Sequence, residues 1–116
     1  MTDVPYRVEK PWGHELIWAR TDKYVGKILH IEEGHVLSLQ YHEQKDETIH
    51  VLKGEIVFRT QVDGVMQEQR MAEGEGCRIT PGTVHQMEAT VTSDLLEVST
   101  PEIDDVVRLE DRYGRV

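Results

Sequence analysis

With 116 residues, the chain is long enough for one hydrophobic core and too short for two ordinary domains, so we expect a single domain over residues 1–116. Charged residues make up 30% and hydrophobic residues 38%, which excludes a disordered chain, and no apolar run approaches the roughly 20 residues that cross a bilayer. The net charge of −9 disfavours nucleic acid and anionic membranes as partners, because both reward clustered cations.

Short strand signals dominate the sequence from residue 24 onward. Segments rich in Val, Ile, Leu and Thr, many of them alternating between apolar and polar residues, predict strands over 24–31, 35–42, 48–52, 55–61, 65–71, 77–80, 85–91 and 94–99. Turn signals separate them, and Asp63-Gly64 indicates a tight hairpin. Many short strands at regular spacing favour an all-β protein with a closed or sandwiched antiparallel barrel.

Four polar residues stand at intervals that would bring them to one metal ion: Gln40, His42, Glu47 and His85. Gln40 and His42 are two positions apart, so on a strand their side chains leave the same face. Glu47 follows after a short connection, and His85 comes from a segment far downstream. Nitrogen and oxygen donors of this kind suit a borderline divalent cation better than a soft one.

His50 lies close to Glu47 in the sequence and could pass for a further ligand. Three positions separate the two residues, so if Glu47 points into the barrel, His50 points outward. The isolated histidines, His14, His30 and His35, are expected to be surface residues.

The glycines around the four candidate ligands have a regular spacing. A first motif runs from Gly34 to Gly54, and a second runs from Gly74 to His85. This arrangement resembles the two motifs of the cupin superfamily, a small antiparallel jelly-roll barrel that holds a metal inside its mouth. The resemblance implies that three ligands come from the first motif and that His85 comes from the second.

Three positions depart from the usual cupin pattern. Gln40 stands where most cupins carry histidine, Thr80 stands where they carry proline, and Ala89 stands where they carry asparagine.

Three stretches, 10–13, 37–42 and 104–115, narrow the resemblance to the type II mannose-6-phosphate isomerases. The cupin domain of that group is often fused behind a mannose-1-phosphate guanylyltransferase domain, and the match here runs from about Val8 to Arg115. The resemblance implies one divalent metal, commonly zinc, with manganese, cobalt, nickel or iron as other options. It also implies interconversion of mannose 6-phosphate and fructose 6-phosphate. Because the guanylyltransferase half is absent from this sequence, the chain is not expected to make GDP-mannose.

This reaction sets requirements on the residues. It moves a proton from carbon 2 to carbon 1 through an enediol, so a base must act while the oxygens on both carbons are polarised. The phosphate needs cations, and an arginine fork suits its oxygens. We expect Arg112, Arg115, Lys27 and Tyr113 to bind the substrate, with Lys27 and Arg112 also taking part in catalysis. Glutamate, lysine and histidine all remain candidates for the base.

Partners and compartment follow from the same sequence. We expect a small-molecule sugar phosphate as the ligand and a homodimer formed through an exposed edge strand. The single cysteine, Cys77, cannot form an intrachain disulfide and is expected to be a small buried residue. The N-terminal residues lack the apolar stretch of a secretory signal, which favours the cytoplasm.

Two other classes of protein stay open. One is a different metalloenzyme, such as an oxygenase that uses iron or manganese, because a fold does not fix a function. The other is a binding or regulatory module that keeps the metal and the sugar pocket without turnover.

Overall fold

The computed structural model describes residues 5–116, and the regular structure in this range consists of strands. Their bounds are β1 (Tyr6–Lys10), β2 (Gly13–Arg20), β3 (Val25–Ile31), β4 (Leu39–Tyr41), β5 (Glu47–Lys53), β6 (Glu55–Val62), β7 (Val65–Ala72), β8 (Gly76–Ile79), β9 (His85–Ala89), β10 (Ser93–Ser99) and β11 (Val107–Glu110). Within the described range, we find no helix with the length and apolar character needed to cross a membrane.

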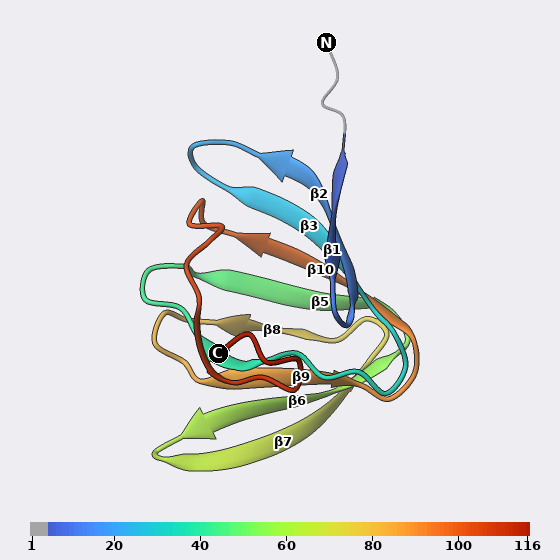
Figure 1. Ribbon diagram of the computed structural model, residues 1–116, viewed down its shortest axis with the longest axis vertical. Coiled ribbons are helices and arrows are strands. Elements are labelled where there is room, and N and C mark those ends of the chain that lie inside the picture. The colour runs from blue at the N-terminus through green and yellow to red at the C-terminus, as the bar shows by residue number, and fades with distance from the viewer. Residues whose placement is uncertain (1–4) are drawn as a thin grey trace.

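The strands form two sheets that enclose the core between them (Figure 1). One sheet has the order β1-β2-β3-β10-β5-β8 and the other has the order β11-β4-β9-β6-β7. All the pairs are antiparallel, and segments far apart in the sequence lie side by side: β10 between β3 and β5, and β9 between β4 and β6. The predicted all-β antiparallel jelly-roll barrel is therefore confirmed.

Apolar side chains from both sheets fill the space between them. The core contains Trp12, Leu29, Ile31, Leu37, Ile49, Val51, Ile56, Phe58, Met71, Ile79, Met87, Ala89 and Leu95. Strand β5 shows how the sequence divides between core and surface, since Ile49 and Val51 are buried with Glu47 while His50 between them is exposed. This two-residue alternation confirms that Glu47 and His50 point to opposite faces.

The eight predicted strands are present, and seven of them have ends within one or two residues of the prediction. The segment 35–42 differs, because only Leu39–Tyr41 is a strand and Val36 forms an isolated bridge with Glu88. The predicted hairpin is also present: β6 and β7 pair up to Val62↔Val65. Its central residues, Asp63 and Gly64, have φ angles of 51° and 77°, as a two-residue turn of this kind requires.

Strands β1, β2 and β11 are not among the predicted strands. Strand β1 alternates over only five residues and is largely exposed, and strand β2 mixes charged and apolar residues without a clear apolar alternation. Strand β11 is a short edge strand that pairs with β4 across Val107↔Tyr41 and Arg108↔Gln40. The segment leading to it crosses from the end of β10 to the opposite sheet, as the red trace in Figure 1 shows. Asp105 in this segment contacts the candidate ligand His42 through its carbonyl oxygen.

Candidate metal centre

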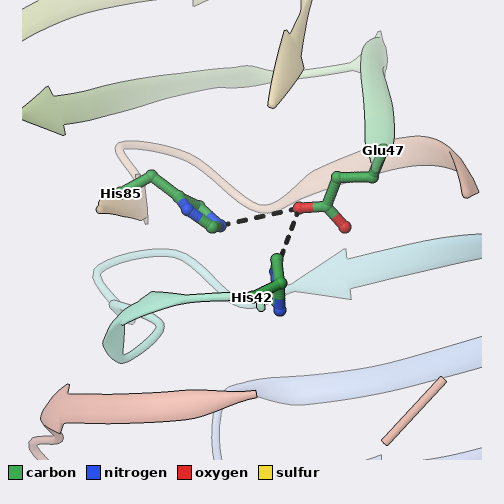
Figure 2. A group of neighbouring side chains, drawn as sticks. All are labelled: His42, Glu47 and His85. Carbon is green, nitrogen blue, oxygen red and sulfur yellow. Dashed lines mark ion pairs between the residues drawn. The ribbon is translucent and has the colours of Figure 1, made fainter. Parts of the chain in front are cut away.

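Three buried side chains from separate segments converge between the sheets: His42 directly after β4, Glu47 at the start of β5 and His85 at the start of β9 (Figure 2). Each offers one ligand atom, and these atoms lie within 4.8 Å of one another. The carboxylate Oε1 of Glu47 lies 3.4 Å from Nε2 of His42 and 3.5 Å from Nε2 of His85. Three of the four candidate ligands are therefore brought together.

Backbone carbonyl groups determine which nitrogen of each imidazole ring carries the proton. Nδ1 of His42 lies 2.5 Å from the carbonyl oxygen of Asp105, and Nδ1 of His85 lies 2.9 Å from that of Thr83. A carbonyl oxygen only accepts, so Nδ1 carries the proton in each ring and donates it. In the neutral rings Nε2 then has a free lone pair directed toward Glu47, an arrangement typical of metal-binding histidines.

The inward-facing nitrogens lack hydrogen-bond partners. Nε2 of His42 and Nε2 of His85 are buried and accept no hydrogen bond from any described residue. Orphaned buried polar atoms are rare because each loses its hydration without compensation. A proton on one ring would form only one hydrogen bond with Glu47. A divalent cation would bind all three acceptors, namely the two Nε2 atoms and the carboxylate of Glu47. The residues present therefore fit a divalent metal.

Asp105 ties the C-terminal region to the loop that carries these ligands. Its carboxylate accepts backbone N–H bonds at 3.1, 2.7 and 2.9 Å from the three residues after His42, namely Glu43, Gln44 and Lys45. These bonds hold the pKa of Asp105 below its ordinary value. The carbonyl and the carboxylate of one residue thus orient His42 and fix the connection to Glu47.

Gln40, the fourth candidate ligand, lies beside the three. It pairs with His85 across β4 and β9, and opposite residues in an antiparallel pair share a face. Its Oε1 accepts a hydrogen bond of 2.7 Å from the hydroxyl of Ser38. Its side chain lines the same cavity as His42 and Glu47, and its role as a ligand stays a prediction.

A cavity of about 220 Å³ opens beside the cluster. This space is many times that of one water molecule, so it suits a small organic ligand. Its lining is rich in charged groups, including Lys27, Lys45, Glu47 and Glu97. All four are buried, which is unusual for charged residues unless they are paired.

These charges form a continuous row of ion pairs. Nζ of Lys45 lies 3.0 Å from Oε2 of Glu47 and 3.1 Å from Oε2 of Glu97. Nζ of Lys27 lies 3.6 Å from Oε2 of Glu97 and 3.2 Å from Oε2 of Glu15. The row therefore links the metal cluster to the far wall of the cavity.

Burial and partner charges compete along this row. Burial disfavours the charge of Lys45, but the carboxylates of Glu97 and Glu47 outweigh it and raise the pKa of the ammonium group. Burial also disfavours the charge of Glu47, yet the positive charge of Lys45 holds its pKa below the usual range. For Glu97, burial and the charge of Glu47 raise the pKa. Burial lowers the pKa of His85 and so favours the neutral ring.

Lys45 and Glu97 are not among the site residues predicted from the sequence. Lys45 precedes Glu47 by two positions, and a lysine in a loop ordinarily indicates a solvated surface. The sequence does contain a signal for Glu97. It lies two positions after Leu95 on the same strand, so both side chains point to the buried face. An acidic residue on an apolar face is a reason to expect a functional or ion-paired group.

The predicted substrate-binding residues lie in different places. Lys27 lines the cavity. Arg112 is exposed and donates a 3.0 Å hydrogen bond to the carbonyl of Gly34, away from the side chains that line the cavity. The hydroxyl of Tyr113 lies 2.6 Å from Nδ1 of His35. Arg115 binds the carboxylate of Asp111 and lines a smaller adjoining cavity.

Two further residues, Arg78 and Cys77, lie away from the cluster. Arg78 is exposed and pairs with Asp46, with its Nε 3.0 Å from Oδ1. Cys77 is half-buried and packs against the core. Burial, followed by the nearby charge of Glu47, raises the pKa of the Cys77 thiol to about 11, so it stays protonated at neutral pH.

Residues 27–99 match the family described as Cupin domain, and the chain belongs to this family. Two curated relatives are similar to nearly the whole chain. The chain is 35% identical over 114 residues to mannose-1-phosphate guanylyltransferase ManC of Salmonella typhimurium, a match that covers 94% of this chain and 23% of the relative. It is 35% identical over 118 residues to a mannose-1-phosphate guanylyltransferase of Escherichia coli, which covers 97% of this chain and 24% of the relative.

The chain therefore spans about a quarter of the length of these relatives. Their names agree with the predicted resemblance to cupin domains that are often joined to a guanylyltransferase.

Solved structures support the same fold. KdgF from Halomonas sp. superposes with a TM-score of 0.72 at 21% identity, covering 85% of this chain and 88% of that one. Oxalate decarboxylase from Bacillus subtilis superposes with a TM-score of 0.77 at 11% identity, covering 90% of this chain and 30% of that one. At these identities the likeness concerns the fold.

Proposed function

We propose that this chain is a metal-dependent isomerase that interconverts mannose 6-phosphate and fructose 6-phosphate. The observation that carries the proposal is the buried His42–Glu47–His85 cluster, in which two imidazole lone pairs and a carboxylate meet beside a charged cavity. The two relatives named for mannose 1-phosphate support a phosphorylated mannose as the substrate class.

In this proposal Gln40, His42, Glu47 and His85 hold one divalent ion, with zinc as the first choice. Nitrogen and oxygen donors suit zinc as well as manganese, cobalt, nickel and iron. When bound, such an ion supplies Lewis-acid polarisation of the carbonyl and hydroxyl oxygens of the sugar. The carbonyls of Asp105 and Thr83 keep the two rings oriented for binding.

The other cavity residues bind the sugar and move the proton. Lys27 and Lys45 present buried ammonium groups that can donate hydrogen bonds to sugar oxygens. Glu97 lies between them and is a candidate for the group that carries the proton between the two carbons. Arg112 would have to leave Gly34 to reach the cavity, so we assign catalysis to the residues that already line it, including Lys27.

We also propose a cytoplasmic homodimer. The two sheets leave β1, β8, β11 and β7 at their edges within the described range, and pairing of one edge with a second copy would cover its free backbone groups.

Incubation of the metal-loaded protein with mannose 6-phosphate tests the reaction. We expect fructose 6-phosphate to form and the activity to disappear when the metal is removed by a chelator and return when it is restored. A coupled assay for fructose 6-phosphate measures both. Absence of conversion with each of zinc, manganese, cobalt and nickel would contradict the proposal. If mannose 6-phosphate then still raised the thermal unfolding midpoint, the chain would be a sugar-phosphate-binding module instead.

A further inference from the structure

The main cavity adjoins a second, smaller one of about 60 Å³. Five side chains line both cavities and so form their common wall: Lys10, Glu15, Leu37, Gln40 and Arg108. Two of the five, Lys10 and Arg108, are cations and are not among the binding residues predicted from the sequence. This wall is therefore a part of the cavity where a negatively charged end of a ligand can meet positive charge.

Some of the charges at and beside this wall are already neutralised. Glu15 pairs with Lys27 at 3.2 Å. Arg115, in the smaller cavity, forms two hydrogen bonds of 2.8 and 3.0 Å with the carboxylate of Asp111. These groups have little net charge to offer to a ligand.

Arg108 is different. Its Nε is buried and has no hydrogen-bond partner, and within residues 5–116 its guanidinium group forms no ion pair with a carboxylate. By contrast, Arg59, Arg70 and Arg78 each face a carboxylate. A buried guanidinium nitrogen without a partner costs free energy, which an anionic ligand would recover.

Lys10 adds a second available cation at the same wall. It is half-buried at the end of β1, and its ammonium group pairs with no carboxylate among residues 5–116. The planar guanidinium group of Arg108 and the ammonium group of Lys10 therefore face one cavity. Guanidinium and ammonium groups together bind phosphate oxygens in many proteins.

The sheet register sets the distance between this wall and the metal cluster. His85 pairs with Gln40, and Gln40 pairs with Arg108, so the three form a row across β9, β4 and β11 on one face. Adjacent strands lie about 4.8 Å apart, which places the backbone of Arg108 about 10 Å from the backbone of His85. A hexose 6-phosphate has its reacting carbons at one end and its phosphate at the other, so its two ends match the two ends of this row.

We propose that Arg108 and Lys10 bind the phosphate group of the sugar phosphate while the reacting carbons lie at the metal cluster. This inference rests on the proposed function for its substrate class. It assigns to Arg108 the phosphate contact that the sequence predicts for Arg112.

Binding of mannose 6-phosphate to the metal-loaded protein, measured by isothermal titration calorimetry, tests the subsite. Arg108→Gln is expected to weaken binding by about tenfold to a hundredfold, because charged hydrogen bonds to the phosphate are lost. Lys10→Gln should weaken it by a smaller factor. Arg70→Gln, the same substitution at an exposed site of the same sheet, is the matched control and should bind within about twofold of the wild type. The metal content of all variants should be unchanged.

The outcomes separate the subsite from the reaction. Unchanged affinity in Arg108→Gln would overturn the subsite, and so would a wild-type protein that binds neither mannose 6-phosphate nor inorganic phosphate. Binding that depends on Arg108 without formation of fructose 6-phosphate would support the subsite and refute the isomerase. If Arg108→Gln does not fold, Lys10→Gln on the other sheet decides: a loss of affinity supports the subsite, and wild-type affinity overturns it.

Discussion

Replacement of Lys45 by methionine is expected to destabilise the metal-free protein by about 3–5 kcal/mol. Lys45 lies between two buried carboxylates, 3.0 Å from Glu47 and 3.1 Å from Glu97. Methionine fills a similar volume but removes the only lysine that contacts Glu47 among the described residues, so two acidic groups remain buried close to each other. A loss of this size is a large part of the stability of an ordinary domain.

Urea unfolding of both proteins after chelation measures the difference. Lys53→Met makes the same substitution at an exposed position of the same strand as Glu47 and should change the unfolding free energy by less than about 0.5 kcal/mol. Saturation with zinc should reduce the deficit of Lys45→Met, because the ion compensates the charge of Glu47. A deficit below about 1 kcal/mol in the metal-free protein would show that the buried row does not depend on Lys45.

Replacement of either histidine of the cluster by alanine is expected to weaken zinc binding by roughly a hundredfold or more, because even groups that only orient a ligand are worth 10- to 100-fold. His42 and His85 each present a nitrogen lone pair to the same space, so the two variants should behave alike. Competition titration with a chromophoric zinc chelator measures the affinities.

His50→Ala is the matched control for these variants. His50 lies three positions from Glu47 on β5, but it is exposed and points away from the interior. Its replacement should leave the zinc affinity unchanged. Full retention of zinc by both His42→Ala and His85→Ala would contradict the metal centre.

The sequence could predict the fold because strand alternation and turns are local signals, and it could predict the core of the site because the two motifs that carry His42, Glu47 and His85 resemble those of cupins. The glycines and turn residues mark the strand ends, and the intervals among His42, Glu47 and His85 follow from the motif that surrounds them. Strand alternation alone excluded His50, and β5 confirms it. Strand alternation of this kind is a local feature that does not depend on contacts with distant segments.

The remaining features depend on contacts between distant segments. Arg108 lies beside Gln40 only because β11 returns to pair with β4, and no local pattern specifies that pairing. Lys45 and Glu97 meet across a loop and a strand, and their charges make sense only in the folded interior. Arg112 has a suitable charge for phosphate, yet its backbone places it against Gly34.

Anomalous diffraction from crystals grown with zinc and mannose 6-phosphate tests the central claim most directly. We predict one strong zinc peak about 2.0–2.2 Å from Nε2 of His42, Nε2 of His85 and a carboxylate oxygen of Glu47, with the sugar in the adjoining cavity. A structure of the same crystals with no zinc among these three side chains, or with the sugar phosphate bound elsewhere on the protein, would contradict the account.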